Sequence, residues 1–138
     1  MVIVDSGFWL ALANKRDTFH QQAIDRFPEF QPEGFITTWC VSTETCYLLQ
    51  QRVGLDAPVA LLDKVSISAI QVFDLTPEHC TRILSLMNQY RDLPMDLADA
   101  SLVILAEHLG HGRILSVDQR DFNTYRWKNT HPFQNLLL

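Results

Sequence analysis

Residues 97–109 restrict the fold of this chain more than any other segment, because as a helix they leave almost no polar face for water. Pro94 supplies a start signal, since its fixed φ suits a first helical turn, and Gly110 and Gly112 break the pattern afterwards. The apolar positions are Leu102, Val103, Ile104, Leu105, Ala106 and Leu109. We therefore expect a helix that is buried on most sides by other layers of structure.

Carboxylates stand at both ends of this segment. Asp96 and Asp99 are three residues apart near the helix start, so their side chains point the same way, and the short strand 113–117 ends on Asp118. A buried helix should not begin with two unpaired carboxylates. The alternative is that acids simply favour the positive end of a helix dipole. That alternative stays open for Asp96, whereas the apolar residues after Asp99 favour a functional role there.

The chain begins in the same way. Residues 1–4 predict a buried strand that ends on Asp5, followed by the turn Ser6-Gly7 and a helix over 8–13. The carboxyl ends of strands form the binding crevice of open α/β sheets, although Asp5 is equally suited to cap the helix. Further helices are predicted over 19–27, 38–52, 56–65 and 76–91, with Pro28 and Pro32 closing the first, and strands over 35–37 and 69–73. Residues 125–128 or 136–138 are candidates for an edge strand.

This alternation of strands and helices predicts an α/β fold with a parallel sheet, helices on both faces and right-handed crossovers. The length suits one domain, and no repeat, low-complexity tract or linker interrupts residues 1–138. No apolar run reaches the roughly 18 to 20 residues of a membrane helix, and no leader opens the chain, so we expect a cytoplasmic protein. Three cysteines without a C-x-x-C pair predict reduced, at least partly buried thiols.

Glu44 is a third kind of acidic position. In the predicted helix 38–52 it shares a stripe with Val41 and Leu48 at helical steps of three and four, so it faces inward. An inward carboxylate costs free energy unless it is paired, hydrogen-bonded or bound to metal. A functional role is the favoured interpretation.

The charge distribution leaves the partner open. The net charge of −5 discourages nucleic-acid binding, but residues 1–109 hold 7 basic and 14 acidic side chains (−7), whereas residues 110–138 hold 4 and 2 (+2). A cation-filled acidic site beside this basic segment would accept a phosphodiester.

Several carboxylates near one another raise one another's pKa, so such a cluster favours a divalent cation. Mg²⁺ and Mn²⁺ prefer oxygen ligands, and one or two such ions promote in-line attack of water on a phosphodiester. The sequence lacks the glycine-rich phosphate motifs, an H-E-x-x-H zinc motif and a serine-nucleophile elbow. A phosphatase of the aspartyl-phosphate type would also carry a second aspartate two residues after Asp5.

Five blocks together resemble the PIN domain family, and most closely its VapC-type toxin ribonucleases. They are residues 4–8 with 10–12, then Asp17 and His20 before Ala23, then Glu44, residues 97–100 and residues 116–122, and they cover residues 1 to about 127. The resemblance implies a three-layer α/β/α sandwich around a mostly parallel sheet of four or five strands. It also implies a Mg²⁺- or Mn²⁺-dependent endoribonuclease, a homodimer and neutralisation by a VapB-like antitoxin.

The family's acidic positions carry over to Asp5, Glu44, Asp99 and Asp118. Asp5, Asp99 and Asp118 would hold the metal, with Asp96 as an additional candidate, and Glu44 would complete the site or position the attacking water. Ser6 and Ser116 would orient a ligand, and Arg120, with Arg113 and Arg91, is a candidate for phosphate contact. Asp121 is expected closer to the turn than to the metal. Phe8, Trp9 and Trp39 would stack on bases, form a dimer contact or belong to the core.

Single-stranded or loop RNA is the expected substrate, since unstacked nucleotides enter a narrow crevice. Three other interpretations remain: a PIN-fold RNA-processing nuclease without an antitoxin, a non-catalytic PIN-like module that binds RNA or protein, and a small-molecule phosphohydrolase.

Overall fold

The centre of the molecule is a five-stranded parallel sheet. In the computed structural model, which describes all 138 residues, the strand order is β3-β2-β1-β4-β7, and every neighbouring pair is parallel. The strands are β1 (Val2–Val4), β2 (Phe35–Thr38), β3 (Ile70–Phe73), β4 (Arg113–Leu115) and β7 (Gln134–Asn135). A separate antiparallel pair joins β5 (Arg126–Trp127) to β6 (His131–Pro132). The order reverses direction between β1 and β4, and such a switch point opens a crevice at the carboxyl ends of the strands.

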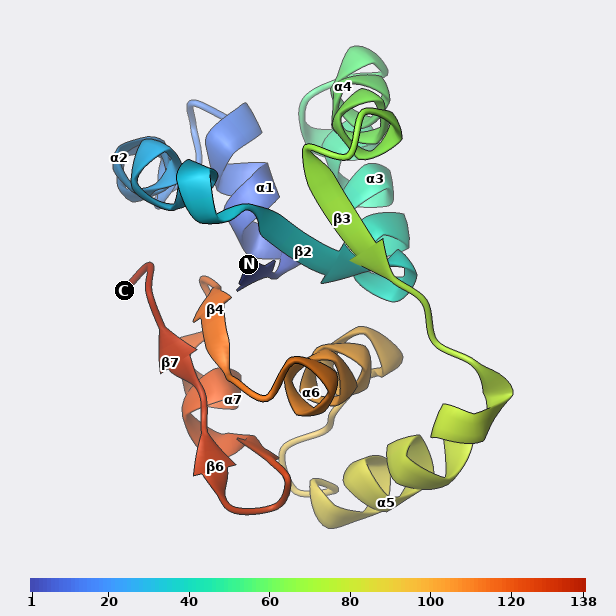
Figure 1. The fold of residues 1–138 in the computed structure, drawn as a ribbon. Helices are drawn as coiled ribbons and strands as arrows, with labels where there is room; N and C mark the ends of the chain where they lie inside the picture. Colours follow the sequence, from blue (N-terminus) through green and yellow to red (C-terminus); the bar gives the residue numbers. More distant parts are fainter.

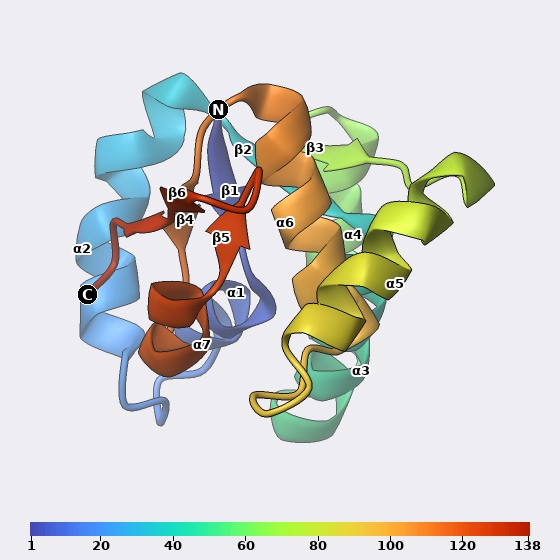
Figure 2. The same ribbon diagram turned by 90° about the horizontal axis from the view of Figure 1, so that it is seen from below.

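Helices cover both faces of the sheet, which confirms the predicted three-layer α/β/α arrangement (Figures 1 and 2). They are α1 (Ser6–Ala13), α2 (His20–Phe30), α3 (Trp39–Arg52), α4 (Asp56–Ser66), α5 (Cys80–Gln89), α6 (Leu97–Leu109) and α7 (Gln119–Thr124), with short 3₁₀ turns at Gln31–Glu33 and Pro77–His79. Helices α1, α2 and α4 lie on one side, and α5, α6 and α7 on the other (Figure 1). None of these helices is both long and apolar enough to cross a membrane.

The strand side chains alternate between two hydrophobic clusters, as a pleated sheet requires. Val2 and Val4 pack in the cluster with α1 and α2, whereas Ile3 packs in the cluster with α5 and α6. Helix α3 contributes Val41 to one cluster and Leu49 to the other. Each three- or four-residue strand is therefore held from both faces.

Helix α6 is buried as the sequence predicts. Eight of its residues are buried, Ala98 and every residue from Ala100 to Ala106, and Gly110 ends the helix in the left-handed conformation with φ of 77°. This burial places the first turn of α6, with Asp99, directly beside the carboxyl ends of the strands.

Two predictions about element ends are wrong. Pro28 does not close its helix, because α2 continues through it to Phe30. The edge strand is neither 125–128 nor 136–138 but Gln134–Asn135, and Arg126–Trp127 instead pairs with His131–Pro132. The hairpin turns through Lys128 and Asn129, which both have positive φ, and this geometry carries the chain back toward β4.

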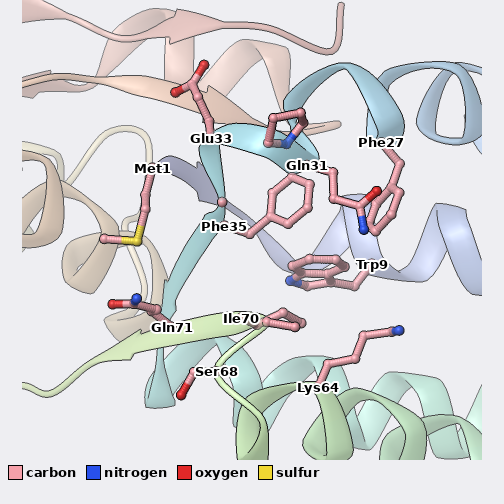
Figure 3. Close-up of a pocket in the computed structure, with 13 residues that line it drawn as sticks. Met1, Trp9, Phe27, Gln31, Glu33, Phe35, Lys64, Ser68, Ile70 and Gln71 are labelled. Carbon is pink, nitrogen blue, oxygen red and sulfur yellow. The ribbon is translucent and has the colours of Figure 1, made fainter.

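The amino ends of the strands form the opposite edge of the sheet. A cavity of about 370 Å³ lies there, with Trp9, Phe27 and Phe35 among its lining residues (Figure 3). Nearby, Arg113 forms a two-armed ion pair with Glu33, one arm of which, from Nη2 to Oε1, measures 2.8 Å. The only carboxylate lining the cavity is thus paired with a cation.

Candidate active site

Two adjacent strands deliver acids to the switch point. Asp5 follows β1, and Ser116 and Asp118 follow β4; the backbone N–H of Asp5 donates to the Leu115 carbonyl at 3.1 Å. The two segments pack tightly, since a Cβ atom at Gly7 would lie 2.2 Å from Val117 Cγ2. Glycine is therefore needed at this position for the chain after β1 to approach the chain after β4.

Three of the acids are also helix N-caps. Asp5 Oδ1 accepts from the Ser6 N–H at 2.8 Å, Asp96 Oδ1 from Asp99 N–H at 2.8 Å, and Asp118 Oδ1 from Asp121 N–H at 3.1 Å. The starts of α1, α6 and α7 therefore carry carboxylates that each satisfy a free backbone donor. Asp5 and Asp96 thus cap helices, as one interpretation of the sequence held. Each cap uses only Oδ1, so Oδ2 is available for other contacts.

Serines connect the acids of neighbouring elements. Ser116 is fully buried; its Oγ donates to Asp5 Oδ2 at 3.0 Å and accepts from the Asp118 N–H at 3.0 Å. Ser6 Oγ donates to Glu44 Oε1 at 3.3 Å, so Glu44 reaches from the middle of α3 to the start of α1. The structure thus brings Asp5, Glu44 and Asp118 to one place.

Asp99 faces the same place from α6. Tyr125, which is fully buried, donates its hydroxyl to Asp99 Oδ2 at 3.3 Å. Burial, followed by repulsion from Asp96, Asp5 and Asp121, raises the pKa of Asp99 to about 8. The carboxylates of α6, β1 and α7 are therefore near enough to one another to resist simultaneous ionisation.

Two further acids have raised pKa values. Burial raises the pKa of Asp5 to about 6 against the lowering effect of its hydrogen bonds from Ser6 and Ser116, and repulsion from Glu44 and Asp118 adds to the rise. The pKa of Glu44 is raised by burial and then by Asp96. No cation of the protein offsets these charges at Asp5, Glu44 or Asp99, so the cluster is poised to attract one from solution.

A family model of the PIN domain matches residues 2–128. The chain belongs to the PIN domain family. Ribonuclease VapC26 of Mycobacterium tuberculosis is 26% identical to it over 125 residues, which are 91% of this chain and 92% of that protein. The crystal structure of Mycobacterium tuberculosis VapC20, described as a sarcin-ricin loop cleaving toxin, superposes with a TM-score of 0.77 at 23% identity. That match covers 87% of this chain and 92% of VapC20, and it shows that the fold is shared.

The acidic cluster of this PIN domain suits a hard divalent cation. No group of three or more His, Cys, Asp or Glu side chains is arranged in the structure so that it could hold a metal ion. Mg²⁺ does not require one, since it is typically held by one or two carboxylates and keeps several waters. The carboxylates of Asp5 and Asp99 offer oxygen ligands, and their raised pKa values mark groups that gain from a bound cation. The donor set therefore fits Mg²⁺ or Mn²⁺.

Asp121 is closer to the acids than the sequence predicts. It contributes to the raised pKa of Asp99, and its Oδ1 is buried without a hydrogen-bond partner, 3.5 Å from Arg120 Nε. Its backbone lies in the turn, where its N–H donates to Asp118, and its side chain adds to the negative charge around Asp99. The D-x-x-D repeat, Asp96 with Asp99 and Asp118 with Asp121, is the sequence signal that could have found it.

The remaining predicted contacts divide between the site and the periphery. Arg120 is at the site, but its side chain is 79% exposed. Arg113 is at the opposite edge in the pair with Glu33, and Arg91 is exposed and donates to Asn88.

The aromatic residues considered for stacking differ in exposure. Phe8 and Trp9 belong to the core, as one interpretation held, whereas Trp39 is half exposed. Among the cysteines Cys80 is exposed, contrary to expectation.

Proposed function

We propose that this PIN domain protein is a metal-dependent endoribonuclease of the VapC toxin type. The observation that carries the proposal is the acidic cluster at the switch point, where Asp5, Glu44, Asp99 and Asp118 converge without a balancing cation. The similarity to VapC26 supports ribonuclease activity, because it extends over nearly the full length of both chains.

Asp5, Asp99 and Asp118 are the residues that would hold Mg²⁺ or Mn²⁺, directly or through bound waters, with Asp96 at the exposed rim as an additional candidate. A bound ion of this kind supplies an activated water and stabilises charge on the leaving oxygen of the phosphodiester. The chain's own part is to orient the carboxylates. Ser116 holds Asp5, Tyr125 holds Asp99, and the backbone of Asp121 holds Asp118.

Glu44 and Ser6 complete the site. Their side chains contact each other through the 3.3 Å hydrogen bond, and Glu44 is half-buried beside Asp5. In the proposed mechanism Glu44 would position the attacking water and accept its proton, and Ser6 would orient Glu44. Arg120 is free to swing toward an RNA phosphate, since its side chain is largely exposed.

The biological setting follows from the same relationship. A VapC-type toxin acts on cytoplasmic RNA, assembles as a homodimer and is neutralised by a VapB-like antitoxin, and we extend this setting to the present chain. Single-stranded or loop RNA remains the substrate class that suits a crevice between two strand ends.

Cleavage of a mixed RNA pool tests the proposal. The purified protein is assayed with Mg²⁺, with Mn²⁺ and with EDTA, beside Asp5→Asn and Asp99→Asn. Asp63→Asn, an exposed acid on α4, is the matched control. We expect metal-dependent cutting by the wild type and the control, and none by the two site variants. Folded protein that cuts no RNA with either metal would contradict the proposal and favour a binding module.

A further inference from the structure

The last strand of the sheet lies outside the PIN family match, which ends at residue 128. This strand, β7, is only two residues long and pairs Gln134 with Arg113 and Asn135 with Ile114. Its backbone bonds reach Ile114, whose carbonyl accepts from the Leu136 N–H at 2.7 Å. The next residue of β4, Leu115, accepts a hydrogen bond at its carbonyl from the Asp5 N–H, on the side that faces β1. Ser116 therefore lies one step beyond the backbone ladder.

The side chain of Asn135 extends the ladder to Ser116. Its Nδ2 donates to the Ser116 carbonyl at 2.9 Å, and its Oδ1 accepts from the Leu137 N–H at 3.0 Å and, at a longer 3.4 Å, from the Ser116 N–H. A flipped amide would place its NH₂ group against two backbone N–H groups, so only this orientation satisfies all three partners. An amide is the side chain that can both donate and accept here.

Ser116 in turn joins two acids of the site. Its hydroxyl donates to Asp5 Oδ2 and accepts from the Asp118 N–H, each at 3.0 Å. No hydrogen bond links Asn135 to a carboxylate. Any influence of Asn135 on Asp5 and Asp118 therefore passes through the position of Ser116.

We propose that Asn135 is a positioning residue of the active site, which clamps the Ser116 backbone so that its hydroxyl sets the spacing of Asp5 and Asp118. The proposal rests on the proposed nuclease function for its effect on cleavage, but not for its effect on the geometry of Ser116. It makes the C-terminal segment part of the catalytic apparatus, although that segment carries no acid.

A double-mutant cycle on cleavage tests the route of action. We expect Asn135→Ala to lower kcat about 10-fold with KM within about twofold, as for other partners that orient metal ligands. In a Ser116→Ala background the same substitution should lower kcat less than about twofold further. Gln134→Ala, an exposed neighbour on the same strand with no side-chain hydrogen bond, is the control. The proposal is overturned if the double variant loses the product of the two single losses in kcat, or if Asn135→Ala changes KM alone.

Hydrogen exchange gives a readout that does not require activity. The amide of Asp118 is protected by Ser116 Oγ. In metal-free protein, Asn135→Ala should speed exchange at Asp118 about 10-fold relative to wild type and to Gln134→Ala, and it should weaken Mn²⁺ binding in calorimetry. If the wild type cleaves no RNA, the nuclease function fails while these two measurements still decide the role of Asn135.

Asn135→Asp keeps the side-chain volume if the alanine variant does not fold. It retains an acceptor for the Leu137 N–H but replaces the donor to the Ser116 carbonyl by a second oxygen. We expect the same faster exchange at Asp118 as in Asn135→Ala. Exchange at the wild-type rate in both folded variants, with unchanged Mn²⁺ affinity, would show that Ser116 needs no clamp.

Discussion

The two edges of the sheet treat carboxylates in opposite ways. At the amino edge Glu33 is paired with Arg113, and this hydrogen-bonded cation lowers the pKa of Glu33. At the carboxyl edge burial raises the pKa of Asp5 and Asp99, and repulsion from neighbouring acids raises it further. The sheet thus has an acid paired with a cation at one edge and acids without a cation at the other. The difference distinguishes a paired acid from the acids that the proposed function requires.

The largest expected effect is on cleavage. Asp5→Asn and Asp99→Asn should each lower kcat/KM more than about 100-fold, because even residues that only support metal ligands typically contribute 10- to 100-fold. Glu33→Gln at the amino edge should stay within about twofold. Steady-state cleavage of one defined RNA measures all three, and a large loss in Glu33→Gln would erase the distinction between the edges.

The second-largest effect is on the free energy of unfolding, which a substitution at the site should raise rather than lower. The pKa of Asp99 is raised from 3.8 to about 8, so its contribution to stability is complete below about pH 4 and is lost as the pH rises through 8. In EDTA at pH 9, Asp99→Asn should therefore be more stable than wild type by about 1 to 3 kcal/mol, a value discounted for partial exposure. At pH 5 the difference should be much smaller, because the Asp99 carboxyl of the folded protein is then protonated. Urea unfolding at both pH values measures this, and a less stable variant at pH 9 would contradict it.

The third effect follows from the cation. Mg²⁺ at about ten times its Kd should stabilise the wild type by about 1 kcal/mol at pH 8, a rise of a few degrees in Tm. At pH 5 the stabilisation should be smaller, because Asp5, with a pKa of about 6, and Asp99 are then mostly protonated. Thermal scans with Mg²⁺ and with EDTA provide the test, and an equal rise at both pH values would place the cation elsewhere.

The smallest effect belongs to the amino edge. Arg113→Ala should cost no more than about 1 kcal/mol, since the pair with Glu33 is about one-third exposed on both sides. The pKa of Glu33 is lowered, so its contribution is present above its unfolded value of 4.5 and is lost as the pH falls through the lower folded value. Chemical unfolding at pH 7 and pH 3 checks both statements, and a cost that persists at pH 3 would assign the effect to packing.

The sequence predicts most of the site because strand ends are visible in it. Asp5 and Asp118 follow short apolar runs, and Glu44 interrupts an apolar helical stripe, so periodicity marks these positions while the parallel sheet and the family resemblance join them. The sequence predicts only the turn at Asp121, because the direction of its side chain depends on how α7 packs. Asn135 was missed because a two-residue polar strand has no periodicity to detect. The sequence predicts a stop at Pro28, but α2 continues past it to Phe30, so the packing of the helix overrides the local preference of proline.

The capping geometry also explains which acid stands at which position. Asp5, Asp96 and Asp118 each devote one oxygen to a backbone amide at the start of their own helix, a reach that the short aspartate arm spans and a longer glutamate would overshoot. Glu44 departs from the middle of α3, caps nothing and needs the extra methylene to cross to Ser6. The short side chains thus cap helices and the long one bridges two helices. An exchange of Asp for Glu at a cap, or of Glu for Asp at position 44, would preserve the charge but change the reach of the carboxylate.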